Sequence, residues 1–153
     1  MYLYLVQHGK AKSEEEDPAR PLSDSGIAEV KKISSFISRL AITVEEVLHS
    51  SKLRAKQTAK ILADSVSIIK GISEADGLAP LDDPALWVET LKSKTLSLML
   101  VGHLPHLAKL SSSLLVGDKE KGIIAFKMGG LVCLKRDDAG CWNLQWMITP
   151  EIL

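Results

Sequence analysis

The chain has 153 residues, of which 46% are hydrophobic and 25% charged, so its composition is that of a globular protein and excludes a disordered or fibrous one. Lysine plus arginine and aspartate plus glutamate both total 19, which gives a formal net charge of +0. No global field therefore favours nucleic acid or an anionic membrane, and any anion site must be a local cluster of positive groups. We expect one domain over residues 1–153 and no nucleic-acid partner.

Cysteine content and hydropathy indicate the compartment. Cys133 and Cys141 form neither a C-x-x-C pair nor paired-ligand spacing, so a structural zinc site and a disulfide framework have no support. The apolar run before Gln7 is only about five residues long, too short for the core of a signal peptide. No apolar stretch approaches the roughly 18 residues of a membrane span. We therefore expect a cytoplasmic protein that does not contact a membrane.

The first half of the chain predicts strands that alternate with helices. Residues 2–6 (YLYLV) are apolar without polar alternation, as in a strand covered on both faces. After a polar loop, Ser23 is suited to cap a helix whose apolar residues recur every three or four positions as far as Leu40. A strand near 46–49, a helix from about Lys52 to Val66 and a weaker strand at SIIKGI follow.

The second half continues the alternation. DDPALWVETLKS, with Pro84 in a first-turn position, predicts a helix. LSLMLV is nearly continuous in apolar residues and is the best candidate for a central strand, and HLAKLSSSLLV is again helical in pattern.

The last segment, GLVCLKRDDAGCWNLQWMI, predicts two strands around a D-D-A-G turn, with Trp142, Leu144, Trp146 and Ile148 on one face. Alternating strands and helices that end in a hairpin favour an α/β fold. We expect a three-layer α/β/α sandwich with a mixed, mostly parallel central sheet and a C-terminal β-hairpin.

Three of the predicted strands end in polar residues that could carry chemistry. The first ends LVQHGK, the second LHSSKLRA and the fourth LMLVGHLPH. Ligands of α/β proteins bind beyond the carboxyl ends of the strands, which would bring His8, Arg54 and His103 to one edge. A single histidine or arginine at such a place is more often a surface residue, but that explanation would have to hold three times.

Two histidines, an arginine and nearby backbone amides can form an oxyanion site with nucleophilic chemistry. Such a site suits a phosphoryl group, because arginine binds phosphate through two hydrogen bonds and imidazole can attack phosphorus. A nucleophilic histidine must be neutral, and burial beside cations would lower its pKa and keep it so.

Two other histidines fit this chemistry less well. His103 and His106 form an H-x-x-H pair, but Pro105 lies between them at a predicted helix start and no cysteine or acid stands at ligand spacing. We therefore expect no metal and no cofactor. His49 lies inside the second strand and is expected to be structural.

Four segments resemble, in the same order, the motifs of the histidine phosphatase superfamily, and most of all its small SixA-type phosphohistidine phosphatase branch. VQHGKA stands where the family has Arg-His-Gly, and RPLSDSG at 20–26 matches Arg-Pro-Leu-Thr followed by Gly. SSKLRAKQTA matches Ser-Pro-x-x-Arg-Ala-x-Gln-Thr, and VGHLPHL matches the late Gly-or-Ser-His-x-Pro pattern. The resemblance spans nearly the whole chain.

The resemblance implies the family's three-layer fold and a metal-independent phosphatase in which His8 is transiently phosphorylated. Arg54 and His103 would hold the phosphoryl oxygens, and Arg20 would lie near the phosphate entrance. The phosphate-binding set implied in this way is Gln7, Gly9, Arg20, Arg54, His103 and Leu104. The partner implied is a protein that carries phosphohistidine, with a small phosphorylated molecule as the alternative substrate.

Gln7, where the family has arginine, is the main departure from the pattern. A glutamine amide still donates hydrogen bonds, but neutral ones are about half as strong as charge-assisted ones. Binding and transition-state stabilisation could each lose roughly 1–3 kcal/mol, or a slowing of roughly ten- to a hundredfold. Lys10 could supply the missing charge if it turns inward, although it is more simply a solvated loop residue.

The second departure concerns a general acid, for which only Glu74 and Asp76 stand in a suitable loop. Phosphohistidine needs less acid assistance than a phosphate ester, since imidazole is the better leaving group. Two alternatives stay open: a weakened module that binds phosphohistidine or phosphate, and a small-molecule phosphomonoesterase, for which the chain has little material for a lid.

Overall fold

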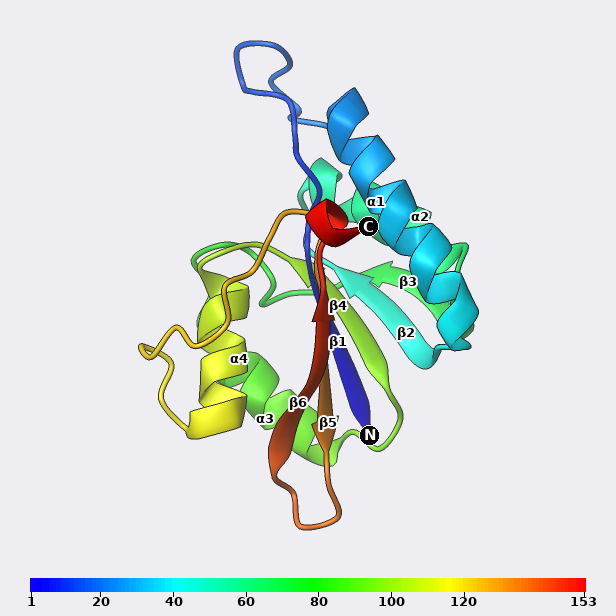
Figure 1. The fold of residues 1–153 in the computed structure, drawn as a ribbon. Coiled ribbons are helices and arrows are strands. Elements are labelled where there is room, and N and C mark those ends of the chain that lie inside the picture. Colours follow the sequence, from blue (N-terminus) through cyan, green and yellow to red (C-terminus); the bar gives the residue numbers. More distant parts are fainter.

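Six strands and four helices alternate along the chain in the computed structural model, which describes residues 1–153 (Figure 1). The strands are β1 (Tyr2–Gln7), β2 (Thr43–His49), β3 (Ser67–Glu74), β4 (Leu98–Gly102), β5 (Leu131–Arg136) and β6 (Trp142–Ile148). The helices are α1 (Asp24–Ile37), α2 (Leu53–Ala63), α3 (Ala85–Ser93) and α4 (His106–Val116), with short 3-10 turns η1 (Ser38–Leu40) and η2 (Pro150–Ile152).

The six strands form one sheet in the order β3-β2-β4-β1-β5-β6. The four strands from β3 to β1 run parallel, whereas β5 is antiparallel to β1 and β6 is antiparallel to β5. The mixed, mostly parallel sheet and the terminal hairpin are therefore confirmed. The strand of LSLMLV, β4, is central as predicted, between β2 and β1.

The sheet is covered on both faces, with α1 and α2 on one side and α3 and α4 on the other (Figure 1). Along β1, Leu3 and Leu5 join the core that packs against α3 and α4, and Tyr4 and Val6 join the core against α1 and α2. The four positions from Leu3 to Val6 are thus buried alternately in one core and the other, while Tyr2 at the start of the strand is exposed, which explains why the run lacks polar alternation. The three-layer sandwich is confirmed.

The loop that follows β1 lies directly on α1. Ser23 caps this helix as predicted, because its hydroxyl accepts a hydrogen bond from the amide of Gly26. A Cβ on Gly26 would lie 2.1 Å from the carbonyl oxygen of Lys10, and a Cβ on Gly9 would lie 2.7 Å from Val30 Cγ2. These two glycines therefore allow the chain after His8 to pack closely against the helix.

The hairpin differs from its prediction by a β-bulge. Cys133 pairs with Trp146, but the next residue of β5 pairs with Leu144, so β6 carries one extra residue. The extra residue reverses the side-chain alternation. Trp146 and Ile148 consequently pack on the α1/α2 side and Trp142 on the α3/α4 side, so the prediction of one shared face was wrong.

Two element boundaries also shift. Helix α2 ends at Ala63 rather than Val66, and β3 extends beyond SIIKGI to Glu74. None of the helices combines the length and the apolar character that a membrane span requires.

Candidate active site

The structure brings the ends of three strands together at the carboxyl edge of the sheet. His8 directly follows β1, Ser50 follows β2 and His103 follows β4. The amide of His8 donates to the carbonyl of Gly102 at 3.1 Å, and the amide of Ser50 donates to that of Val101 at 3.1 Å. Because these strands are parallel neighbours, their side chains converge as the sequence predicts.

The His8 ring is held in one orientation by hydrogen bonds at both nitrogens. Its Nδ1 lies 2.7 Å from the carbonyl oxygen of Gly9, which can only accept, so Nδ1 carries the proton. Its Nε2 therefore keeps its lone pair, which accepts a hydrogen bond from the Nε–H of Arg54 at 3.4 Å. A neutral imidazole whose Nε2 keeps its lone pair is the form that a nucleophile requires.

The surroundings of His8 favour this neutral form. Burial lowers its pKa, and the positive charges of Arg54 and Arg20 lower it further, while the hydrogen bond to Gly9 opposes them. The guanidinium of Arg54 makes no hydrogen bond other than the one to His8, so its two terminal nitrogens have no protein acceptor.

His103 lies beside His8, with 4.8 Å between the ring centroids. Its Nε2 is 2.5 Å from the hydroxyl oxygen of Ser50, while its buried Nδ1 has no hydrogen-bond partner. Burial lowers the pKa of His103 to about 3, and the neighbouring charges on His8, Arg54 and Lys52 act in the same direction. His103 is therefore neutral at physiological pH and takes part through hydrogen bonds rather than charge.

Helix α2 supports the cluster through Thr58, which is fully buried. The Thr58 hydroxyl donates to the carbonyl of Arg54 at 2.8 Å and accepts from the amide of Gly9 at 3.0 Å. One side chain thus ties the backbone beside His8 to the helix that carries Arg54. We did not assign roles to Ser50 and Thr58 from the sequence, although both lie in the SSKLRAKQTA segment that marks the site.

Arg20 approaches the same cluster from the loop before α1. Its charge lowers the pKa of both His8 and Arg54, which places the guanidinium within electrostatic range of the two. The Arg20 backbone has φ = 47°, a left-handed conformation that costs a non-glycine residue about 1 kcal/mol. Its Nε–H donates to the carbonyl of Lys12 at 3.2 Å, which fixes the side chain along the loop.

Gln7 and Leu104 flank the two histidines in sequence. The Gln7 side chain is buried, and its Oε1 has no hydrogen-bond partner. Leu104, the residue after His103, is partly exposed and precedes a cis peptide bond to Pro105. The amide of Gly129 donates to the carbonyl of Gln7 at 3.0 Å and to that of His8 at 3.1 Å, which ties the loop before β5 to the end of β1.

The remaining candidate side chains lie outside this hydrogen-bonded group. His49 ends β2, and its Nδ1 contacts the carbonyl of Ser50 at 2.8 Å. His106 is fully buried at the start of α4, with no partner at either ring nitrogen. Glu74 ends the edge strand β3, and Asp76 is exposed in the loop after it. No group of three or more His, Cys, Asp or Glu side chains is arranged to hold a metal ion.

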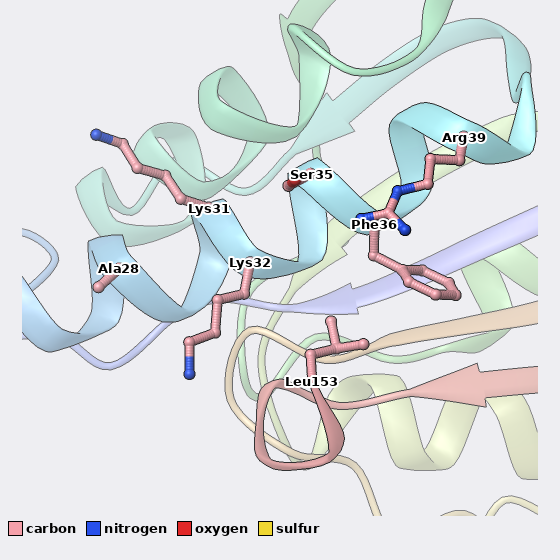
Figure 2. Close-up of a pocket in the computed structure, with 7 residues that line it drawn as sticks. All are labelled: Ala28, Lys31, Lys32, Ser35, Phe36, Arg39 and Leu153. Atoms are coloured by element: carbon pink, nitrogen blue, oxygen red, sulfur yellow. The ribbon is translucent and has the colours of Figure 1, made fainter.

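A separate concave surface of about 520 Å³ lies between α1 and the end of the chain (Figure 2). The side chains of Phe36 and Leu153 point toward each other there; Lys31 and Lys32 come from α1, as Phe36 does, and Arg39 comes from η1. No residue of the histidine cluster lines this surface, so it is distinct from the candidate site.

The fold is an α/β sandwich, and two neutral histidines and two arginines gather at the carboxyl edge of its sheet. Residues 3–79 match the family model of the histidine phosphatase superfamily (branch 1), and the chain belongs to that family. An uncharacterized protein of Picosynechococcus sp. is 32% identical over 143 residues, which cover 84% of this chain and 86% of that protein.

Two further similarities span almost the entire chain. The phosphohistidine phosphatase SixA of Escherichia coli (strain K12) is 24% identical over 155 residues, which cover 98% of this chain and 94% of SixA. A solved structure of the protein histidine phosphatase SixA complexed with tungstate superposes with a TM-score of 0.85 at 24% identity and covers 99% of both chains. The expected family is therefore confirmed, and family membership supports phosphatase activity.

Proposed function

We propose that this chain is a phosphatase that works without a metal ion, forms a phosphohistidine intermediate at His8 and acts on phosphohistidine in a protein. The observation that carries the proposal is the geometry of His8. Its Nδ1 proton is directed at the Gly9 carbonyl, so Nε2 carries a lone pair and faces the cation of Arg54. That arrangement offers a nucleophile and an anion-binding group to the same phosphorus.

The reaction takes place in two displacements. In the first, His8 Nε2 forms a bond to phosphorus while the bond between phosphorus and the substrate's nitrogen breaks, and that nitrogen keeps the electron pair. In the second, a water oxygen attacks the phosphorus on His8, the N–P bond breaks and inorganic phosphate leaves with the proton that water releases. His8 returns to its neutral form, so one water is consumed for each phosphoryl group.

The other residues act on the phosphoryl oxygens. The two terminal nitrogens of Arg54, which have no protein acceptor, can bind two oxygens at once. His103 and Arg20 bind the remaining oxygens, the first as a neutral hydrogen-bond donor and the second as a cation at the entrance. The loop that contains Leu104 adds backbone contacts, and Gln7 adds a neutral amide. The backbone of Gly9, by contrast, is occupied by Thr58 and by His8 Nδ1, so Gly9 orients the nucleophile rather than binding an oxygen.

A phosphohistidine substrate fits the absence of a positioned acid in the hydrogen-bonded cluster. A phosphorylated imidazole that is protonated on its other nitrogen leaves as a neutral ring and needs no general acid. Glu74 stands at the end of β3, two strands from β4, which corresponds to about 10 Å across the sheet. A phosphate ester, whose leaving alkoxide must be protonated, is correspondingly less suited.

The rim of the site favours a protein as the carrier of the phosphoryl group. Leu53 and Leu104, next to Arg54 and His103 in the chain, are 37% and 38% exposed, and Met128, next to Gly129, is 48% exposed. Exposed apolar side chains of this kind are available for contact with a protein partner. The similarity to SixA, which is named as a phosphohistidine phosphatase, points in the same direction.

Turnover of a generic aryl phosphate at mildly acidic pH, compared between the native chain and His8→Ala, tests the proposal. We expect hydrolysis by the native chain and its loss in the variant. His49→Asn is the matched control, since it alters another buried histidine at a neighbouring strand end and should retain activity. Equal activity of the native chain and His8→Ala would contradict the proposal.

A second candidate function is a binding module that captures a phosphorylated group with little turnover, and Gln7 favours it because the residue is neutral. Calorimetric binding of phosphate without any phosphorylated His8 would support this module over the phosphatase.

A third candidate, a small-molecule phosphomonoesterase, needs Glu74 or Asp76 as the acid. Loss of ester hydrolysis in Glu74→Gln or Asp76→Asn, with phosphoramidate hydrolysis retained, would support that role.

A further inference from the structure

A lysine stands beside the candidate site where β2 gives way to α2. Lys52 is the N-cap residue of α2, and its backbone N–H donates to the Ser50 hydroxyl at 3.4 Å. That same hydroxyl contacts His103, and Arg54, two residues farther along, contacts His8. Lys52 therefore lies between the two residues that hold the two histidines.

The Lys52 ammonium group has no partner within the chain. Its side chain is exposed, and none of the six ion pairs between side chains includes it. Its positive charge contributes to the lowered pKa of His103, so it lies within electrostatic range of that ring. Lys10 behaves differently, because its charge helps to lower the pKa of Glu16 in the acidic loop and is not among the charges that act on His8 or His103.

Few of the side chains at the site carry a positive charge, so a further cation would stabilise a bound phosphoryl group. Gln7 is neutral, and burial keeps His8 and His103 largely neutral as well. Apart from Lys52, the formal positive charges around the histidines are those of Arg54 and Arg20. A phosphoryl dianion that is being transferred spreads its charge over three oxygens, and each added cation stabilises it.

We propose that Lys52 binds a peripheral oxygen of the substrate's phosphoryl group and supplies the positive charge that Gln7 does not. This inference rests on the proposed function, because the ligand is the phosphoryl group transferred to His8. Lysine suits the task, since its flexible stem carries a compact point charge that can swing from solvent onto an oxygen. The interaction is partly exposed and therefore weakens as ionic strength rises.

Calorimetric binding of inorganic phosphate at low salt tests the inference, with Lys52→Gln measured in the native chain and again in a Gln7→Arg background. We expect Lys52→Gln to weaken binding about three- to tenfold in the native chain and less than about twofold beside Arg at position 7. Lys52→Arg should retain the affinity and its salt dependence. Lys56→Gln, one turn along the same exposed helix surface, is the matched control and should change nothing.

Equal affinities of the native chain and Lys52→Gln would overturn the inference, as would the same loss in both backgrounds. A native chain that binds no phosphate would also overturn it. The proposed function is judged separately by turnover in His8→Ala, so an enzyme that depends on His8 but not on Lys52 would leave the phosphatase standing and remove only the role of Lys52.

Discussion

Two partly buried arginines, Arg54 and Arg136, lie at opposite ends of the strands of the same sheet, and their guanidinium groups differ in how many protein acceptors they contact. One terminal nitrogen of Arg136 donates to the carbonyl of Leu91 and the other donates to that of Lys94, both at 2.5 Å. Arg136 thus caps the last turn of α3 with its donors satisfied by the protein. Arg54, at the carboxyl edge, contacts only the Nε2 of His8.

The difference shows how to separate a structural arginine from one that binds a ligand. Buried and half-buried donors are normally paired, because an unpaired one loses the hydrogen bonds that water would give it. A guanidinium that a protein holds in place without providing acceptors is prepared for acceptors that arrive with a ligand. By that reasoning we assign Arg136 to stability and propose Arg54 as a phosphate-binding residue.

Arg54→Ala is expected to have the largest effect. Removing a donor pair aimed at the transferred phosphoryl group should lower kcat/KM by about 10² to 10³-fold, while the free energy of unfolding changes by less than about 1 kcal/mol. Arg54→Lys should recover only part of the rate, because it keeps the charge and loses the planar fork. Steady-state kinetics and urea unfolding measure both, with Lys56→Ala as the control, and an unchanged kcat/KM in Arg54→Ala would contradict this role.

Gln7→Arg is expected to sharpen the comparison by adding a further guanidinium at the carboxyl edge, beside those of Arg54 and Arg20. Turnover should rise roughly ten- to a hundredfold, because a charge-assisted interaction replaces a neutral one. Stopped-flow or steady-state assays with an aryl phosphate check this. Unchanged turnover in a folded Gln7→Arg protein would show that Gln7 is not what limits the reaction.

Arg136→Ala should have the reverse pattern to Arg54→Ala. Loss of the cap leaves carbonyl groups of α3 without their charged donor, so the free energy of unfolding should fall by about 1–3 kcal/mol. The value of kcat/KM per folded molecule should stay the same, because Arg136 lies at the far edge from His8. Urea unfolding and kinetics on the same sample measure the two quantities. A loss of kcat/KM in Arg136→Ala as large as that in Arg54→Ala would contradict the assignment of different roles to the two arginines.

The two edges should also differ in their response to pH, because only the carboxyl edge holds buried neutral histidines close together. The pKa of His103 is about 3 in the folded chain against 6.5 as its ordinary value, so between these values the unfolded chain binds the extra proton. Stability is thus fully present above pH 6.5 and is lost as the pH falls toward 3, by up to about 1.4 kcal/mol per pH unit for this group. His8 and His106, whose pKa values are also lowered, act in the same direction.

Urea unfolding at several values between pH 4 and pH 7, with His103→Gln as the comparison, measures this contribution. The variant should show a shallower loss of stability with falling pH. An identical slope in the two proteins would mean that His103 titrates normally in the folded state.

The sequence predicted the arrangement of the strand tips because parallel strands deliver their carboxyl ends to one edge, whatever the details of packing. His8, Arg54 and His103 therefore converge as expected. The contacts that orient these side chains could not be predicted from the sequence, since the Ser50–His103 and Gly9–Thr58 pairs join residues about 50 positions apart. Such pairs depend on the final register of the sheet and not on local pattern.

The hairpin shows the opposite case, in which local pattern was misleading. Alternation in WNLQWMI suggested one apolar face, and a single extra residue near Gln145 reversed it. A bulge is not visible in hydrophobic periodicity, because either side of it alternates normally. Trp142 and Trp146 consequently serve different cores.

The central claim is that His8 accepts the phosphoryl group, and direct observation of the phosphorylated protein tests it best. The native chain would be mixed with a phosphoramidate donor, quenched at alkaline pH and examined by phosphorus NMR and by peptide mass spectrometry. We expect one phosphoryl group, stable to alkali and labile to acid, on the peptide that contains His8, present in His49→Asn and absent from His8→Ala. A phosphoryl group at another residue, or turnover with no phosphorylated His8 at any time after mixing, would contradict the account.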